Sequence, residues 1–573
     1  MRAFKHVGKL LQILFAALLF AVIFSNRLLA DDKDSTNPPA KSAPAKSDAS
    51  KIESPAPLTE RERWMLDRME QLEKRVAELE AKSNPAEAKA AETAAAQPTP
   101  AQPSSANAPS AAPVAATVAS PAVAAAVTKS QEQASVAPPQ KAEPFAFADF
   151  TWLNGNARTK ELAMDTKFFT PEIRADIDYI YDFNHPKDNT IGGSSEVFRA
   201  NEVQVTQLGV GGDFHYDNVR ARLMTQFGLY SQTTPRNDAS PARGQWNLAD
   251  AYRYISEAYG CYHFNALHGI NVDAGIFMSY IGLFSYYQFD NWAYQPSYVS
   301  SNTPWFFNGV RVQIFPTEHL KIEPWFTNGW QSYGRFNSRP GLGFQILWRP
   351  NGWLSILGNQ YALGEDALNT PGRVRYHTDD SIEVKYYDNK EKFLDKAAFS
   401  LTGDMGCEHG GGVSCAGGSA KGPKQSFLGY MFYNRFWFDN DKYGLTLGGG
   451  QINNPGRYLV LLPPINGATA ASGTPYFTEN PGDPYKAWDV SGTFDWMPSQ
   501  YITFRWEYNH RAANVPYFSG SGGVTPPGGN NNAPGSFVCL SGFTTCNGSP
   551  ANTWFPDLRK TENRLNMAIL VKF

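Results

Sequence analysis

Apolar and polar residues alternate along most of the chain, from about residue 144 to residue 573. In one such segment Val219 and Leu223 fall on one face, while Arg220 and Arg222 fall on the other. Successive side chains of a β-strand point to opposite faces of the sheet, so a period of two predicts strands with one apolar and one polar face. A soluble β-sandwich gives the same period, and the connections between strands decide between the two.

The connections alternate between short turns and long loops. The short ones are residues 316–319, 349–352, 439–442 and 497–500; the long ones are 184–202, 285–304, 454–485 and 511–561. Short turns on one side and long loops on the other are typical of an outer-membrane barrel. We therefore predict an all-β fold, a transmembrane antiparallel β-barrel of about 16 strands, with 14–18 compatible with the pattern. The expected strands begin near Glu172, Val203, Asn218, Tyr252, Ile270, Phe306, Leu320, Gly341, Gly352, Arg373, Leu394, Gln425, Tyr443, Lys486, Tyr501 and Glu562.

The last expected strand alternates up to an aromatic residue at the end of the sequence. Leu565, Ile569 and Phe573 share the apolar face, and Arg564 and Lys572 share the other. This pattern resembles the C-terminal signal by which outer-membrane barrels are recognised for assembly. We expect Phe573 to be part of that signal, with the barrel-assembly machinery as its partner.

The N-terminal part of the chain has a different composition. Residues 1–30 have a basic start and an apolar core too short for a spanning helix, which is typical of a signal peptide cleaved after Ala30. An uncleaved anchor helix is the alternative. Export predicts an oxidising compartment. Residues 31–57 are polar and rich in Pro, Ala and Ser, and we expect them to be disordered.

A short helix is expected at residues 58–82. Met65, Leu72 and Leu79 recur every seven residues, and Met69 and Val76 complete the a and d positions of a coiled coil. Either this helix joins a homotrimer or it is a single solvated helix. Residues 83–143, dominated by Ala, Pro and Ser, are expected to form a linker before a barrel at 144–573.

Composition limits the function classes. The 573 residues carry a net charge of −3 without a basic tract, so we expect no nucleic-acid partner. The mean hydropathy of −0.40 suits a barrel, whose alternating strands average to a polar value. The chain has no Gly-x-Ser-x-Gly elbow, His-Glu-x-x-His helix or phosphate loop. We expect neither an enzyme nor a cofactor.

Five cysteines bear on the loops. Cys407 and Cys415 lie in one expected loop, and Cys539 and Cys546 lie in another, so we predict two disulfides. A metal site formed by Cys407, His409 and Cys415, with Glu408 beside them, is the alternative, but the spacing matches no strong zinc pattern. Cys261 is left over, and we expect it to be a free thiol in the barrel wall.

If the apolar faces meet lipid, the polar faces line the lumen. The side chains expected there are Arg220, Arg222, Arg253, Glu257, Asp273, Arg311, Lys321, Glu323, Arg373, Arg375, Arg505 and Glu507. Mixed signs with some excess of Arg suggest a water-filled pore that mildly favours anions. The alternative is that many of these residues pair across strands and stiffen the wall, and we expect this of half of them.

The third long loop, residues 285–304, is expected to fold inward and narrow the channel. Its aromatic residues include Tyr286, Tyr287, Trp292, Tyr294 and Tyr298. These rings either form an apolar slide for sugars or pack the loop against the wall, and the second reading is favoured.

The chain resembles the OmpL-like β-barrel porin family over residues 152–413. The resemblance rests on the stretches 152–156 (WLNGN), 222–228 (RLMTQFG), 251–258 (AYRYISEA) and 406–412 (GCEHGGG). It implies a barrel in the lipid of the bacterial outer membrane, and it says less about a substrate. We predict a porin through which small hydrophilic solutes diffuse passively. A substrate-specific channel and a structural or anchoring barrel are the alternatives.

Overall fold

The computed structural model describes Lys74 and residues 143–573, with internal gaps at 187–188, 190, 192–196, 198, 239, 241–244, 336, 366–371, 420–423, 456–483, 516, 522–544, 547–548 and 551–557. The chain divides into two compact units, and the first, Met1–Ala116, contains Lys74 as its one described residue. The predicted signal peptide, the segment 31–57, the remainder of the helix 58–82 and the linker to residue 142 therefore lie outside the described residues.

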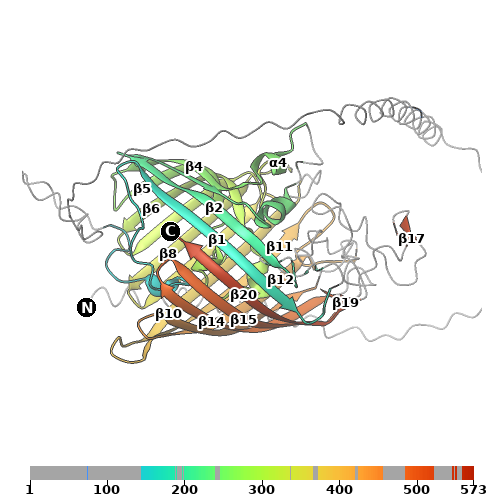
Figure 1. Cartoon of the computed structure of the whole chain (residues 1–573). Coiled ribbons are helices and arrows are strands. Elements are labelled where there is room, and N and C mark those ends of the chain that lie inside the picture. Colours follow the sequence, from blue (N-terminus) through green and yellow to red (C-terminus); the bar gives the residue numbers. More distant parts are fainter. Residues whose placement is uncertain are drawn as a thin grey trace, which may run out of the picture. The chain divides into compact units, whose positions relative to one another are not determined.

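The second unit is a closed barrel of antiparallel strands in which every strand pairs with the next along the chain and the last pairs with the first. Its members are β1 (Phe169–Asp182), β2 (Val203–Tyr216), β3 (Val219–Thr225), β4 (Ile255–Phe264), β5 (Ile270–Met278), β6 (Phe306–Thr317), β7 (Leu320–Thr327), β8 (Gly341–Asn351), β9 (Leu354–Leu363), β10 (Val374–Asp388), β11 (Leu394–His409), β12 (Ser426–Phe438), β13 (Tyr443–Asn454), β14 (Tyr485–Ser499), β15 (Ile502–Ala513) and β20 (Thr561–Lys572). Figure 1 shows these strands tilted around the barrel. The predicted fold class is confirmed.

Strand starts follow the sequence pattern to within three residues. The difference reaches three at β1, which begins at Phe169, and at β4, which begins at Ile255. At β4 the reason is the short helix α4 (Leu248–Tyr252), whose N-cap Asn247 accepts a hydrogen bond from the backbone N–H of Asp250. A capped helix turn takes the residues that the pattern assigned to the strand.

The remaining elements lie in the loops or precede the barrel. They are η1 (Thr151–Leu153), α3 (Tyr230–Thr233), η2 (Thr234–Asn237), η4 (Gln288–Asp290), α5 (Tyr298–Ser301), β16 (Phe518–Ser519), β17 (Thr545–Cys546), β18 (Ser549–Pro550) and β19 (Leu558–Arg559). Within the described part of the chain, no helix is long and apolar enough to cross a membrane.

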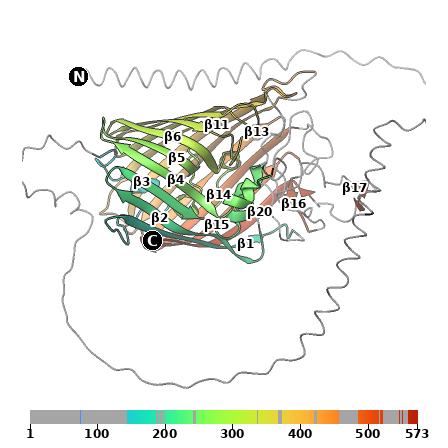
Figure 2. The same cartoon turned by 90° about the horizontal axis from the view of Figure 1, so that it is seen from above.

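The two ends of the barrel differ. One end, the turn end, carries the short connections such as 217–218, 352–353 and 500–501, together with the C-terminus. Figure 1 places the C-terminus at the end opposite β19, and Figure 2 places it at the end opposite β16, the strand that pairs with β19. Phe573 closes the seam there, because its backbone N–H and C=O bond to Ile173 at 2.9 and 3.2 Å and its ring stacks on Tyr501. The opposite end is called the loop end below.

The barrel is apolar outside and polar inside. Leu223 and Phe432 are among the large apolar side chains exposed on the outer face, whereas Arg435, Arg505 and Glu507 point inward and are fully buried. A soluble protein places these side chains the other way round, and a transmembrane barrel requires this arrangement. The β-sandwich reading of the alternation is thereby excluded.

Candidate pore and its inner loop

A long connection between β5 and β6, residues 279–305, lies inside the barrel and is called the inner loop. Glu507 of β15 accepts hydrogen bonds from the backbone N–H groups of Tyr294 (2.6 Å) and Gln295 (2.9 Å). Asp489 of β14 accepts one from the backbone N–H of Tyr298 (3.1 Å). Glu507 and Asp489 both point into the lumen, so these bonds place the inner loop inside the barrel, against the inner face of β14 and β15.

Arginines of β15 hold the carbonyl side of the same loop. Arg505 donates to the carbonyl oxygens of Gln288 (3.1 Å) and Asn291 (2.6 Å), and Arg511 donates to that of Pro296 (2.8 Å). Both guanidinium groups are fully buried. A buried charge is costly unless it is paired and hydrogen-bonded, and the loop backbone supplies part of that pairing. Arg505 and Glu507 therefore serve to hold the loop.

The aromatic residues of the inner loop pack against protein. Tyr294 donates its hydroxyl to Asp176 of β1 (3.0 Å), and Tyr287 donates to Glu257 of β4 (2.7 Å). Tyr286 bonds to Gln226 in the same way. All five rings singled out in the sequence are buried, with exposed fractions of at most 8%: Tyr286, Tyr287, Trp292, Tyr294 and Tyr298. The slide reading is wrong for these rings, because their faces contact the wall and one another.

Asp290 of the inner loop is tied by two ion pairs to β1 and β20, the strands that close the barrel. Asp290 receives Arg174 of β1 at 2.7 Å and Lys572 of β20 at 3.3 Å. Burial alone would raise the pKa of the Asp290 carboxyl, but the two cations outweigh burial and hold that pKa below its ordinary value. The loop is therefore tied to the strands that close the barrel.

A neighbouring part of the wall, formed by β2, β3 and β4 and separated from β15 by β20 and β1, contains the expected basic patch. Arg222 is enclosed by three carboxylates, Asp213 at 2.7 Å and Glu172 and Glu257 at 3.0 Å each. Its side chain is only 11% exposed, although the Asp213 side chain is 50% exposed. Of the sequence alternatives for Arg222, cross-strand pairing is the one that the structure supports.

Arg220, two residues away, has a different environment. It is exposed, it points inward on the same face as Arg222, and it lies in register with Cys261 of β4. Within the described residues Arg220 has neither an ion pair nor a side-chain hydrogen bond, and Cys261 is a free thiol. Asp213, Arg220, Arg222 and Cys261 together are called the open wall.

Four further residues predicted to face the lumen do so on β5, β6 and β7, and the structure joins them in two pairs. Arg311 donates to Asp273 at 2.6 Å, and Lys321 donates to Glu323 at 2.6 Å. Both carboxylates are almost fully buried. These four residues lie close together on adjacent strands, and their charges cancel in pairs.

Arg253 is placed differently from the expectation. The pattern put it on a strand beginning at Tyr252, in phase with the lumen-facing residues. In the structure Arg253 is the C-cap of α4 and forms an ion pair with Asp250 in the same turn. Because the helix occupies these residues, Arg253 is not part of any strand of the barrel wall.

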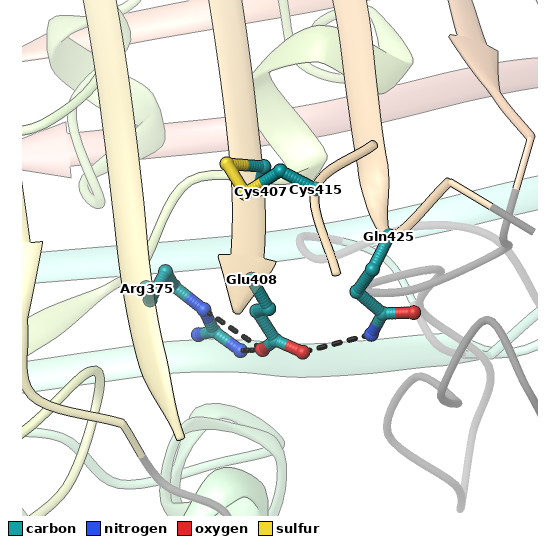
Figure 3. Close-up of a disulfide and its surroundings, with 5 residues drawn as sticks. All are labelled: Arg375, Cys407, Glu408, Cys415 and Gln425. Carbon is teal, nitrogen blue, oxygen red and sulfur yellow. Dashed lines mark hydrogen bonds and ion pairs between the residues drawn. A yellow bond between two sulfur atoms is a disulfide. The ribbon is translucent and has the colours of Figure 1, made fainter. Parts of the chain in front are cut away.

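Arg373 and Arg375 lie at the loop end, far from the patch on β3. Arg375 pairs with Glu365 at 2.8 Å and with Glu408, which also receives Arg373 at 3.2 Å. Gln425 donates to the second oxygen of Glu408 at 2.8 Å (Figure 3). This cluster ties β10, β11 and the start of β12 together, and its charges are mutually satisfied.

The disulfide between Cys407 and Cys415 is confirmed. It links the end of β11 to the loop that follows, next to Glu408 (Figure 3). The bond uses both sulfur atoms, which removes the alternative of a metal site there. The predicted partner of Cys546, Cys539, lies outside the described residues, so that pairing stays a prediction.

Some residues that hold the inner loop were not singled out in the sequence. Arg435, Asp489 and Arg511 occupy polar positions on strands that the pattern did locate. The alternation of apolar and polar residues was the available signal. Extending the set of lumen-facing positions along β12, β14 and β15 would have included these three residues. Nothing local in the sequence marks which inward residues meet the loop.

A closed 16-stranded barrel with an apolar outside, a charged inside and a loop folded into its lumen defines a porin of the bacterial outer membrane. A family model described as "Putative beta-barrel porin-2, OmpL-like" matches residues 174–538, more than half of the chain. The chain belongs to this family, and it is a passive outer-membrane channel in contact with membrane lipid. No curated protein matches its sequence.

The search of solved structures finds several outer-membrane proteins to which the chain is similar. The chain is similar to OmpT of Vibrio cholerae, with 9% identity, coverage of 72% of this chain and 100% of that one, and a TM-score of 0.39. It is similar to the channel DcaP of Acinetobacter baumannii (12% identity, 71% and 96% coverage, TM-score 0.38). It is also similar to an anion-selective porin from Comamonas acidovorans (10% identity, 71% and 99% coverage, TM-score 0.36). Family membership, rather than these likenesses, assigns the class.

Proposed function

We propose that small hydrophilic solutes diffuse along the open wall, and that the pore mildly prefers anions. The observation that carries this proposal is the contrast between exposed Arg220 and enclosed Arg222. A cation that faces water without a carboxylate partner raises the local concentration of anions, and the low-dielectric wall of a channel strengthens that effect. Arg222 adds little, because three carboxylates surround it.

We further propose that the inner loop is the constriction of this channel. The loop's central part, residues 288–298, is bonded to β14 and β15 on the inner side of the barrel, and Tyr287 bonds to Glu257 of β4. Solutes would then pass between the loop and the open wall. In porins, the size of such a gap and the charges that border it set which solutes pass.

The partners proposed from the sequence remain proposals. We propose recognition of Phe573 by the barrel-assembly machinery and a homotrimer joined through the helix expected at 58–82. No covalent chemistry and no cofactor enter the proposed function, because passive diffusion requires neither.

The test is ion selectivity in planar bilayers. Arg220→Glu in the full chain should move the reversal potential under a salt gradient toward cation preference, most strongly at low salt, where screening is weak. Arg339→Glu makes the same charge change at an exposed residue outside the strands and serves as the control. An unchanged reversal potential in a conducting Arg220→Glu barrel would exclude this role of Arg220.

The same recordings separate the alternatives. A substrate-specific channel would give conductance that saturates with solute or is blocked by it. A structural or anchoring barrel would give no conductance in the unmodified protein.

A further inference from the structure

The segment before β1, residues 145–158, runs across the lumen at the turn end and is called the strap. Phe145 bonds to the carbonyl of Glu318 (2.8 Å), in the turn between β6 and β7. Further along, the Trp152 indole donates to the carbonyl of Gly352 (3.1 Å), in the turn between β8 and β9. The strap thus passes from one side of the barrel mouth toward the other.

The far end of the strap reaches β14 and β15. Asn156 donates to the carbonyl of Ser499 (3.0 Å) and to the Thr503 hydroxyl (3.2 Å), and Arg158 donates to the carbonyl of Met497 (2.6 Å). Asn156 is fully buried. Trp152 and Ala157 belong to a buried cluster with the inward side chains Ala398, Met431, Tyr433, Trp437 and Met497. The strap is therefore inside the barrel and is fixed at both ends.

The strap also contacts the inner loop through hydrogen bonds to backbone carbonyl groups. The N–H of Gly155 donates to the carbonyl of Asp290 (2.9 Å), and the Trp292 indole donates to the carbonyl of Trp152 (3.2 Å). A Cβ atom added at Gly155 would lie 2.4 Å from the carbonyl oxygen of Asn291. The approach is too close for any other residue, so glycine is required here.

Arg435 of β12 joins strap, loop and wall in one set of bonds. It donates to the carbonyl oxygens of Gly155 (2.7 Å) and Trp292 (3.2 Å) and pairs with Asp495 of β14 (2.8 Å). The Arg435 side chain has no exposure to solvent. A planar guanidinium with several fixed donors can hold three partners in a defined geometry, which a lysine could not do.

From these contacts we propose that the strap is a second part of the constriction, and that Gly155 and Arg435 are positioning residues for solute passage. The wall holds the inner loop from the side, and the strap holds it from the turn end. Without the strap contacts the loop would keep its bonds to β14 and β15 and the Asp290 ion pairs, but it would lose the hydrogen bonds to Gly155 and Trp152 at the turn end. The cross-section between loop and open wall would then widen or fluctuate. This rests on the proposed role of the inner loop as the constriction.

The experiment places Gly155→Val in the full chain and measures single-channel conductance and the size cut-off for neutral sugars in liposome swelling. The added side chain must push strap and loop apart, so conductance should rise on the order of two-fold, with more flicker, and larger sugars should enter. The control is Gly403→Ala on β11, where an added Cβ meets nothing within 4 Å. The slower migration of boiled protein on a gel shows in each case that the barrel had formed.

A second pair of variants serves in case Gly155→Val does not fold. Trp292→Phe removes the hydrogen bond from the indole to the Trp152 carbonyl of the strap, whereas Trp437→Phe makes the same change on a neighbouring buried ring, 5.6 Å away. The Trp437 indole N–H has no hydrogen-bond partner in the described structure. The proposal expects a higher size cut-off for Trp292→Phe than for Trp437→Phe.

The outcomes separate this proposal from the proposed function. A folded Gly155→Val barrel with unchanged conductance and size cut-off would overturn the role of the strap, as would equal cut-offs for the two Trp variants. If the unmodified protein does not conduct, the proposed function itself fails.

Discussion

Two walls of the same barrel use inward charges in opposite ways. On the open wall, Arg220 faces water and Asp213 is half exposed. On the wall of β12, β14 and β15, called the loop-bearing wall, Arg435, Arg505 and Glu507 are buried and bonded to the inner loop or the strap. Strand alternation is the same on both walls. The difference arises from what each charged side chain faces, which is solvent at Arg220 and the folded loop or the strap at Arg435, Arg505 and Glu507.

The contrast teaches that an inward charge in a barrel is not automatically a pore-lining charge. A charge that faces water acts on ions through its field. A charge that is buried against a loop acts on geometry, because its removal leaves polar partners unsatisfied in a place that water does not reach. We therefore propose that ion selectivity depends on the open wall and that pore size depends on the wall that holds the inner loop.

The largest effect is expected on the loop-bearing wall. Glu507→Ala removes the acceptor of two inner-loop N–H groups and of the Thr493 hydroxyl, all of them buried. We expect a loss of stability of about 3 kcal/mol, from unsatisfied buried donors, and a higher conductance as the loop loosens. Urea titration followed by gel mobility measures the stability, and bilayer recording measures the conductance. The stability of Glu507→Gln, which retains one acceptor oxygen, should lie between that of the wild type and that of Glu507→Ala. Equal stability of these three proteins would show that Glu507 does not hold the inner loop.

The next largest effect is the difference in stability loss between substitutions of the two arginines of the open wall. Arg222→Glu places a fourth carboxylate among Glu172, Asp213 and Glu257, so the barrel should lose about 2 kcal/mol of stability through like-charge repulsion. Arg220→Glu should leave stability nearly unchanged, because exposed charges contribute little. The measurement is the urea midpoint of each folded variant. Equal losses for both would show that Arg220 also has a structural role.

Water access to the two walls can be compared with single cysteines. In a Cys261→Ala background, Arg220→Cys should react within minutes with a membrane-impermeant thiol reagent added to reconstituted barrels, because position 220 is exposed to the lumen. Ser491→Cys on β14 should react at least about ten-fold more slowly, since Ser491 is buried. Similar labelling rates would mean that the inner loop does not cover its wall.

The smallest effect is expected for the dependence of stability on pH. The pKa of Asp290 is held below its ordinary value by Arg174 and Lys572, so its ion pair contributes stability above the unfolded pKa and loses it only as the pH falls through the folded pKa. The stability difference between the wild type and Asp290→Asn should therefore be the same at neutral pH and at about pH 5. A difference that shrinks over this range would show that Asp290 takes up a proton there.

The strands could be predicted from the sequence because lipid on one side and polar surroundings on the other impose a period of two on every strand. The inner loop could be located by its length and aromatic content. Which residues hold it could not, because Arg435 and Asp489 bond to a loop more than a hundred residues away in sequence. Arg253 was misplaced because a helix cap at Asn247 is a local signal that competes with alternation.

The strap also constrains the order in which the barrel can form. Its bonds to Gly352, Arg435 and Ser499 join residues separated by 200, 280 and 343 positions. Contacts between such distant parts of a chain close large loops and form late in folding. The strap precedes β1, with residues 159–168 between them, and β1 pairs with β20 to close the barrel. The strap contacts can therefore form only once the strands that carry Arg435 and Ser499 and the turn that carries Gly352 are in place, so the packing of the interior belongs to a late stage of assembly.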